Sequence, residues 1–169
     1  VVLLSACSTT PPAALRGSGD LGVVIERADG NVKVIETTGR SVLETVGGLG
    51  DLSHASVVFS RDGRYAYVFG RDGGLTKVDL LCRVAVKRVV QAGNSIGGAI
   101  SQDGRLVAVA NYTPGGVKVF AADTLDLAAD IPATYGDGRR AKVVGLEDAT
   151  GSRFVFSLFE AGEMRLVDL

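Results

Sequence analysis

The only histidine of the chain, His54, is the residue best suited to bind a metal or a cofactor. A neutral imidazole offers one ring nitrogen as a ligand near neutral pH. His54 stands just before the apolar run Ala55-Ser56-Val57-Val58-Phe59, which is typical of a strand. On position alone two interpretations stay open: a ligand at the mouth of a binding site, or a loop histidine that is solvated or satisfied by its neighbours.

A glycine pattern near the start, Gly17-Ser18-Gly19-Asp20-Leu21-Gly22, matches the G-x-G-x-x-G loop of dinucleotide-binding proteins. That loop follows a strand and opens a helix. Here a polar stretch precedes the glycines and a strand-like run follows them. We therefore expect no NAD site, and interpret the glycines as a flexible entry to the first strand.

The first residues indicate lipid attachment. Val1-Val2-Leu3-Leu4-Ser5-Ala6-Cys7 has the pattern of an apolar signal region ending in a bacterial lipobox, where small residues admit a signal peptidase and Cys7 receives the lipid. The alternative is a chance cysteine in an ordinary secretory signal. We expect a signal end at 1–7, a linker at 8–20, and a periplasmic, membrane-anchored lipoprotein. With Cys7 lipidated, Cys82 is expected to form no disulfide.

Composition narrows the class of partner. The chain has 169 residues, 46% of them hydrophobic and 22% charged, with a formal net charge of −1. This mixture is typical of a globular domain. Lys, Arg, Asp and Glu are interspersed, so no positive field favours a nucleic acid backbone, and nucleic acid is not expected as a partner.

A repeated turn predicts the fold. Ser60-Arg61-Asp62-Gly63-Arg64 recurs as Ser101-Gln102-Asp103-Gly104-Arg105, 41 residues later, and loosely at 148–154. Short β-branched runs lie between these turns, and no stretch has sustained helical spacing. Such a period is typical of four-stranded propeller blades, whereas a β-sandwich needs no period and a Rossmann fold needs helices. The expected fold class is all-β, a β-propeller.

The strand-like runs divide the region 21–169 into blades. They predict a partial blade at 21–48, complete blades at 54–91 and 95–132, and a partial blade at 142–169. Propellers close with about four to eight blades. We therefore expect this chain to be an incomplete fragment of three to four blades, closed by a further C-terminal part.

Three long stretches carry a family resemblance. Residues 49–56, 67–80 and 92–104 closely resemble the NirF family of haem d1 biosynthesis proteins. More distantly, they are similar to the eight-bladed d1 domain of cytochrome cd1 nitrite reductase. The resemblance implies an eight-bladed propeller in the full-length family, and haem d1 or dihydro-haem d1 as the bound macrocycle.

The resemblance also implies a set of site residues. His54 falls where the reductase has its proximal haem d1 ligand, Arg27 and Arg71 fall on arginines that face the carboxylates of the macrocycle, and Tyr112 falls on a tyrosine beside the same pocket. Guanidinium pairs with carboxylate in a two-pronged geometry that lysine does not provide. Without the resemblance, the two arginines could equally cap turns, and Tyr112 could serve in packing.

Two departures from the reductase stand out, because Val57 and Ile96 occupy positions of further arginines there. The pocket is therefore expected to hold the macrocycle with fewer charges, which suits a protein that must release it.

The function that the resemblance implies is a late step of haem d1 biosynthesis in denitrifying bacteria. In this interpretation the protein is an oxidoreductase that converts the propionate of dihydro-haem d1 to the acrylate, with His54 holding the iron as the catalytic residue. The implied partners are the haem d1 precursor, cytochrome cd1 nitrite reductase, other maturation proteins and the membrane. Two alternatives stay open: a non-catalytic carrier of haem d1, and a propeller scaffold for protein contacts.

The substitution Cys7→Ala should release the full-length protein from membranes, because a short apolar remnant without acyl chains anchors weakly. Cell fractionation of the variant and of the wild-type protein measures the effect. Unaltered membrane partitioning of the Cys7 variant would contradict the lipobox.

Overall fold

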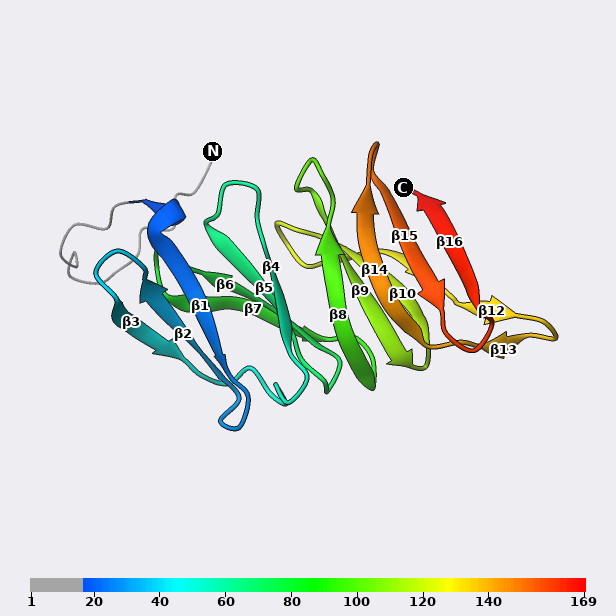
Figure 1. The fold of residues 1–169 in the computed structure, drawn as a ribbon, viewed down its shortest axis with the longest axis horizontal. Helices are drawn as coiled ribbons and strands as arrows, with labels where there is room; N and C mark the ends of the chain where they lie inside the picture. The colour runs from blue at the N-terminus through cyan, green and yellow to red at the C-terminus, as the bar shows by residue number, and fades with distance from the viewer. Residues whose placement is uncertain (1–16) are drawn as a thin grey trace.

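The computed structural model describes residues 17–169 (Figure 1), so the predicted lipid site at Cys7 and most of the predicted linker lie outside the described residues. One 3₁₀ turn, η1 (Ser18–Asp20), precedes a series of strands. No helix within this range is long and apolar enough to cross a membrane. The strands are β1 (Leu21–Glu26), β2 (Asn31–Glu36), β3 (Ser41–Val46), β4 (Ser56–Phe59), β5 (Tyr65–Phe69), β6 (Gly74–Asp79), β7 (Val84–Val90), β8 (Asn94–Ile100), β9 (Leu106–Thr113), β10 (Gly116–Ala121), β11 (Leu127–Ile131), β12 (Thr134–Tyr135), β13 (Arg139–Arg140), β14 (Val143–Ala149), β15 (Arg153–Leu158) and β16 (Glu163–Asp168).

The strands form four antiparallel sheets that follow one another along the chain (Figure 1). We call them blade 1 (β1–β3), blade 2 (β4–β7), blade 3 (β8–β11) and blade 4 (β14–β16), with the hairpin β12–β13 inserted between the last two. The first strand of blade 3, β8, lies against β4 on one side and β14 on the other. The predicted all-β class and open, partial propeller are confirmed.

The repeated Ser-x-Asp-Gly turn is held by its own side chains. The Ser60 hydroxyl donates to Asp62 Oδ1 at 2.5 Å and accepts from the Tyr65 N–H at 2.8 Å. Gly63 has φ 70° and Gly104 φ 75°, a region that glycine enters without a Cβ penalty. The copy at 101–106 has the same hydrogen bonds. Each turn is therefore specified locally, which explains why the repeat is visible in the sequence.

The packing between blades follows from the alternation of side chains along each strand. In β5, Ala66 and Val68 face the core shared with blade 1, whereas Tyr67 and Phe69 face the core shared with blade 3. A third core lies between blades 3 and 4. Because successive side chains of a strand point to opposite faces, one strand contributes to two cores, and each blade is stabilised by its neighbours.

The prediction for Cys82 is wrong. Cys82 lies between β6 and β7 and is disulfide-bonded in the structure. A disulfide at Cys82 was not expected because the thiol of Cys7 was assigned to a lipid, and Cys7 lies outside the described residues.

A close contact between blades 2 and 3 gives a stability prediction. A Cβ at Gly98, in β8, would clash with the Ala108 carbonyl and approach Phe69 Cε1 at 2.5 Å. We expect Gly98→Ala to lower the free energy of unfolding by about 1–3 kcal/mol, because the packed backbone must shift. Gly19→Ala is the matched control, since its Cβ would meet nothing within 4 Å. Denaturant titration of the full-length protein measures both variants, and equal stability would contradict the packing.

Candidate functional site

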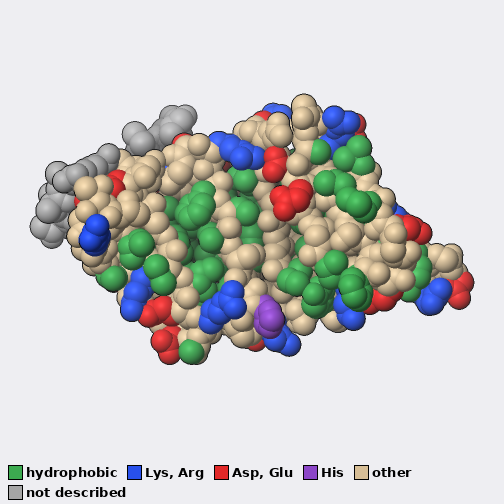
Figure 2. All heavy atoms as spheres, in the orientation of Figure 1, with side chains coloured by type: hydrophobic (Ala, Val, Ile, Leu, Met, Phe, Trp, Pro, Cys, Tyr) green, Lys and Arg blue, Asp and Glu red, His purple; other side chains and the backbone are tan. Residues whose placement is uncertain are grey.

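One end of the blades carries all the sequence-predicted site residues that the structure describes. Arg27 lies in the β1–β2 turn, His54 in the segment between β3 and β4, Arg71 in the β5–β6 turn, and Tyr112 near the end of β9. In an antiparallel blade these connections lie at the same end. We call this end the site face. In Figure 2 the single purple side chain, His54, lies at the lower edge with Lys and Arg side chains near it.

The structure brings three of these residues to one small cavity. His54, Arg71 and Tyr112 line it together with Asn94 and Ile96, both in β8, and its volume is about 100 Å³. His54 and Arg71 are exposed, and Tyr112 is half-buried. The lining therefore combines an imidazole, a guanidinium, a phenol and an amide around one apolar side chain.

Arg27 does not line the cavity, but it lies beside the segment that carries His54. Its Nη1 is 3.5 Å from the carbonyl oxygen of Ser53, to which it donates a long hydrogen bond. The guanidinium of Arg27 is thus a neighbour of the site.

The turn that carries Arg71 is fixed by backbone hydrogen bonds on two sides. The Arg71 N–H donates to the Asp51 carbonyl at 2.8 Å, and the Arg71 carbonyl accepts from the Ser95 N–H at 3.3 Å. The buried Ser95 hydroxyl also donates to the carbonyl of Gly70 at 2.6 Å. The turn is therefore tied both to the segment before β4 and to β8.

The carboxylate next to Arg71 is engaged elsewhere. Asp72 forms an ion pair with Arg88, whose Nε also donates to the Leu49 carbonyl at 3.1 Å. Within residues 17–169 the guanidinium of Arg71 takes part in no ion pair or side-chain hydrogen bond. It is consequently available to an anionic ligand.

Asp51 gives the site one fixed negative charge. Hydrogen bonds from Ser53 lower the pKa of its carboxyl group below the ordinary value, and the nearby charges of Arg71 and His54 lower it further. Asp51 therefore stays ionised at neutral pH, beside the two residues that would face a ligand.

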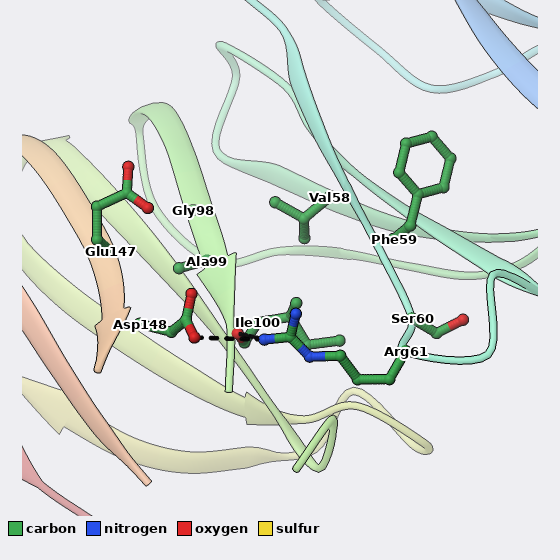
Figure 3. A pocket seen from close by; sticks show the side chains of 9 residues that line it. All are labelled: Val58, Phe59, Ser60, Arg61, Gly98, Ala99, Ile100, Glu147 and Asp148. Atoms are coloured by element: carbon green, nitrogen blue, oxygen red, sulfur yellow. Dashed lines mark hydrogen bonds and ion pairs between the residues drawn. The ribbon is translucent and has the colours of Figure 1, made fainter. Parts of the chain in front are cut away.

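The opposite end of the inner strands has a cavity of about 430 Å³ with different chemistry (Figure 3). Arg61 reaches across β8 and donates to the carbonyls of Ile100 and Ser101, at 2.8 and 2.9 Å, and its Nη2 lies 3.3 Å from Asp148 Oδ2. None of the sequence-predicted site residues lines this cavity. Arg61 uses its guanidinium for contacts within the protein, and these contacts link blades 2, 3 and 4.

The sequence analysis missed Asn94 and Asp51 as site residues. The 41-residue repeat places Asn94 at the position equivalent to Ser53, next to His54, and this was the available signal. Nothing in the sequence singles out Asp51, because its proximity to Arg71 depends on the contact between the segment 47–55 and the β5–β6 turn.

Comparison with known proteins supports the resemblance. NirF of Pseudomonas aeruginosa is 66% identical over 170 residues, which cover 99% of this chain and 43% of that protein. NirF of Stutzerimonas stutzeri is 64% identical with the same coverage. The predicted resemblance to NirF is confirmed, and the chain spans less than half the length of these relatives. The dihydro-heme d1 dehydrogenase of Pseudomonas aeruginosa is 36% identical over 112 residues, 66% of this chain and 23% of that protein.

Solved structures agree with the propeller. Dihydro-heme d1 dehydrogenase NirN in complex with DHE has a TM-score of 0.84 and 29% identity, covering 95% of this chain and 35% of NirN. The β-propeller domain of Cps50 (Swd1) from Myceliophteria thermophila has a TM-score of 0.71 at 14% identity, covering 89% of this chain and 48% of that one, and so supports the fold alone. Residues 16–169 match the cytochrome D1 heme domain family, and the chain belongs to that family.

Proposed function

We propose that this chain binds a haem d1-type macrocycle on its site face and acts in a late step of haem d1 formation, the oxidation of dihydro-haem d1. The observation that carries the proposal is the meeting of His54, Arg71 and Tyr112 at one cavity. Among residues 17–169, the Arg71 guanidinium takes part in no ion pair or hydrogen bond. Membership of the cytochrome D1 heme domain family supports it, as does the similarity to a dihydro-heme d1 dehydrogenase.

Each residue has a definite task towards this substrate. The imidazole of His54 suits the iron, since a neutral ring nitrogen is a common axial ligand of haem iron. Arg71 suits a side-chain carboxylate, because its planar fork matches the two carboxylate oxygens. Tyr112 can donate its hydroxyl to a further oxygen, and Arg27 lies close enough to the segment of His54 to face a second carboxylate.

The oxidation itself uses the chemistry of the macrocycle. Conversion of a propionate to an acrylate removes two hydrogen atoms, so two electrons must pass to an external acceptor and two protons must leave. The role of the described residues is to position the macrocycle and to balance its charge. In this proposal the protein works in the periplasm.

A second candidate function is the delivery of finished haem d1 to cytochrome cd1 nitrite reductase. It is favoured by Ile96, an apolar side chain in the cavity lining, and by the exposure of His54 and Arg71. A site with few charges and much solvent contact holds its ligand reversibly.

Turnover distinguishes the two functions. Full-length protein is incubated with dihydro-haem d1 and a two-electron acceptor, and the absorption spectrum is followed. Formation of many equivalents of haem d1 per protein supports the enzyme, and stoichiometric binding without conversion supports the carrier. Absence of both binding and conversion would rule out both functions.

The variant His54→Ala should change or abolish the spectrum of the bound macrocycle, because loss of an axial imidazole alters the coordination of the iron. Since His54 is exposed, we expect the variant to lose about 0.5 kcal/mol of stability or less. Gln102→Ala, an exposed change at the opposite end of the blades, is the control. A normal spectrum of the bound macrocycle in the His54 variant would show that the ligand lies elsewhere.

The variant Arg71→Lys should bind the macrocycle about tenfold more weakly, with an unchanged iron spectrum, because lysine keeps the charge and loses the paired hydrogen bonds. Arg105→Lys, whose arginine pairs with Asp103 at the opposite end, is the control. Spectral titration measures both affinities. Equal affinities would remove Arg71 from the site.

A further inference from the structure

Phe159 is a large apolar side chain left in solvent on the site face. It lies in the β15–β16 turn and is 64% exposed, whereas Phe154 and Phe156 of the preceding strand are 0% and 2% exposed. Single exposed apolar side chains are common on protein surfaces, so it is the place of Phe159 among the site residues that bears on its role.

The turn holding Phe159 is fixed rather than loose. The Phe159 N–H donates to the Lys142 carbonyl at 2.9 Å, and the Gly162 N–H donates to the Leu158 carbonyl at 3.0 Å. The Glu160 carboxylate accepts from the Lys142 N–H at 2.8 Å and pairs with Lys142 Nζ at 3.2 Å. The conformation of the turn that carries Phe159 is therefore fixed by hydrogen bonds.

The position of Phe159 repeats that of the site residues in the other blades. Each blade has a basic residue in the middle of the strand that follows its site-face turn, namely β2, β6, β10 or β16. The residue six positions before this basic residue lies in that turn or next to it. These pairs are Arg27 and Lys33, Arg71 and Lys77, Tyr112 and Lys118, and Phe159 and Arg165. The strand pairings agree in three blades, where Arg27, Tyr112 and Phe159 each come three residues after the residue that pairs with the basic residue. Arg71 comes four residues after Tyr67, the partner of Lys77, so its position is shifted by one residue.

Two of these equivalent positions already line the cavity, namely Arg71 and Tyr112. Arg71 stays exposed and Tyr112 half-buried although a following blade packs against each of their blades. The position is therefore one that the packing of blades leaves open towards the site face.

We propose that Phe159 is a further substrate-binding residue, which packs its ring against an apolar part of the macrocycle. This inference rests on the proposed function. Along the four equivalent positions the side chains change from guanidinium in blades 1 and 2 to aromatic in blades 3 and 4. A macrocycle lying across them places its carboxylates towards Arg27 and Arg71, and an apolar, π-bonded edge towards Phe159.

Spectral titration of the full-length protein with dihydro-haem d1 tests the proposal. We expect Phe159→Ala to weaken binding about tenfold, because the aromatic contact and its buried area are lost. Phe159→Tyr, which keeps the ring, should bind within about twofold of wild type, and thermal melting should be unchanged in both. Phe59→Ala is the matched control, since Phe59 is also exposed, at 39%, but lines the cavity at the opposite end.

Three results would overturn the inference while leaving the proposed function standing, provided that the wild-type protein binds. These are wild-type affinity in Phe159→Ala, an equal loss of affinity in Phe59→Ala, and a large fall in melting temperature in Phe159→Ala, which would mean that another part of the protein covers this side chain. If the wild-type protein binds no macrocycle, the proposed function fails and this inference fails with it.

Discussion

The site depends on the backbone hydrogen bonds that hold the β5–β6 turn in place. Backbone hydrogen bonds tie Arg71 to Asp51 on one side and to Ser95 on the other, and so join the segment of His54, the turn and β8. Because backbone groups make these bonds, the geometry does not use the Arg71 guanidinium. Asp72, the adjacent acid, is paired with Arg88. The peptide groups therefore fix the turn, and the guanidinium of Arg71 stays outside this hydrogen-bond network.

Three arginines at the end of the blades opposite the site are used differently from Arg27 and Arg71. At the end opposite the site, Arg61, Arg64 and Arg105 each pair with an aspartate of the protein. On the site face, Arg27 and Arg71 form no ion pair within the described range. Since most exposed ion pairs contribute about 1 kcal/mol or less, pairing these two would add little stability. Leaving them unpaired costs the fold little and keeps two guanidinium groups on the site face.

The fold was predictable because its signal is local. Asp62 and Gly63 act within one turn, and the same turn recurs in the next blade, so the blade period can be read along the chain. The site was only partly predictable. His54 stands out by type, but Arg71 and Tyr112 meet it through contacts between blades, and only the family resemblance pointed to them. Cys82 was assigned wrongly because the chemistry of a second cysteine was assumed.

The proposed function requires the site to bind a large ligand and to release it, and the exposure of its charged groups suits both. Its charged groups are solvent-exposed, so each contact alone is worth about 1 kcal/mol or a little more. Equivalent positions in successive blades lie at the same face, so in the proposed function their contributions would combine on a single rigid macrocycle that pays the entropy of association once. Affinity then depends on how many turns touch the macrocycle at the same time. A small tilt of the macrocycle breaks several contacts together, so a site of this kind can be specific without being irreversible.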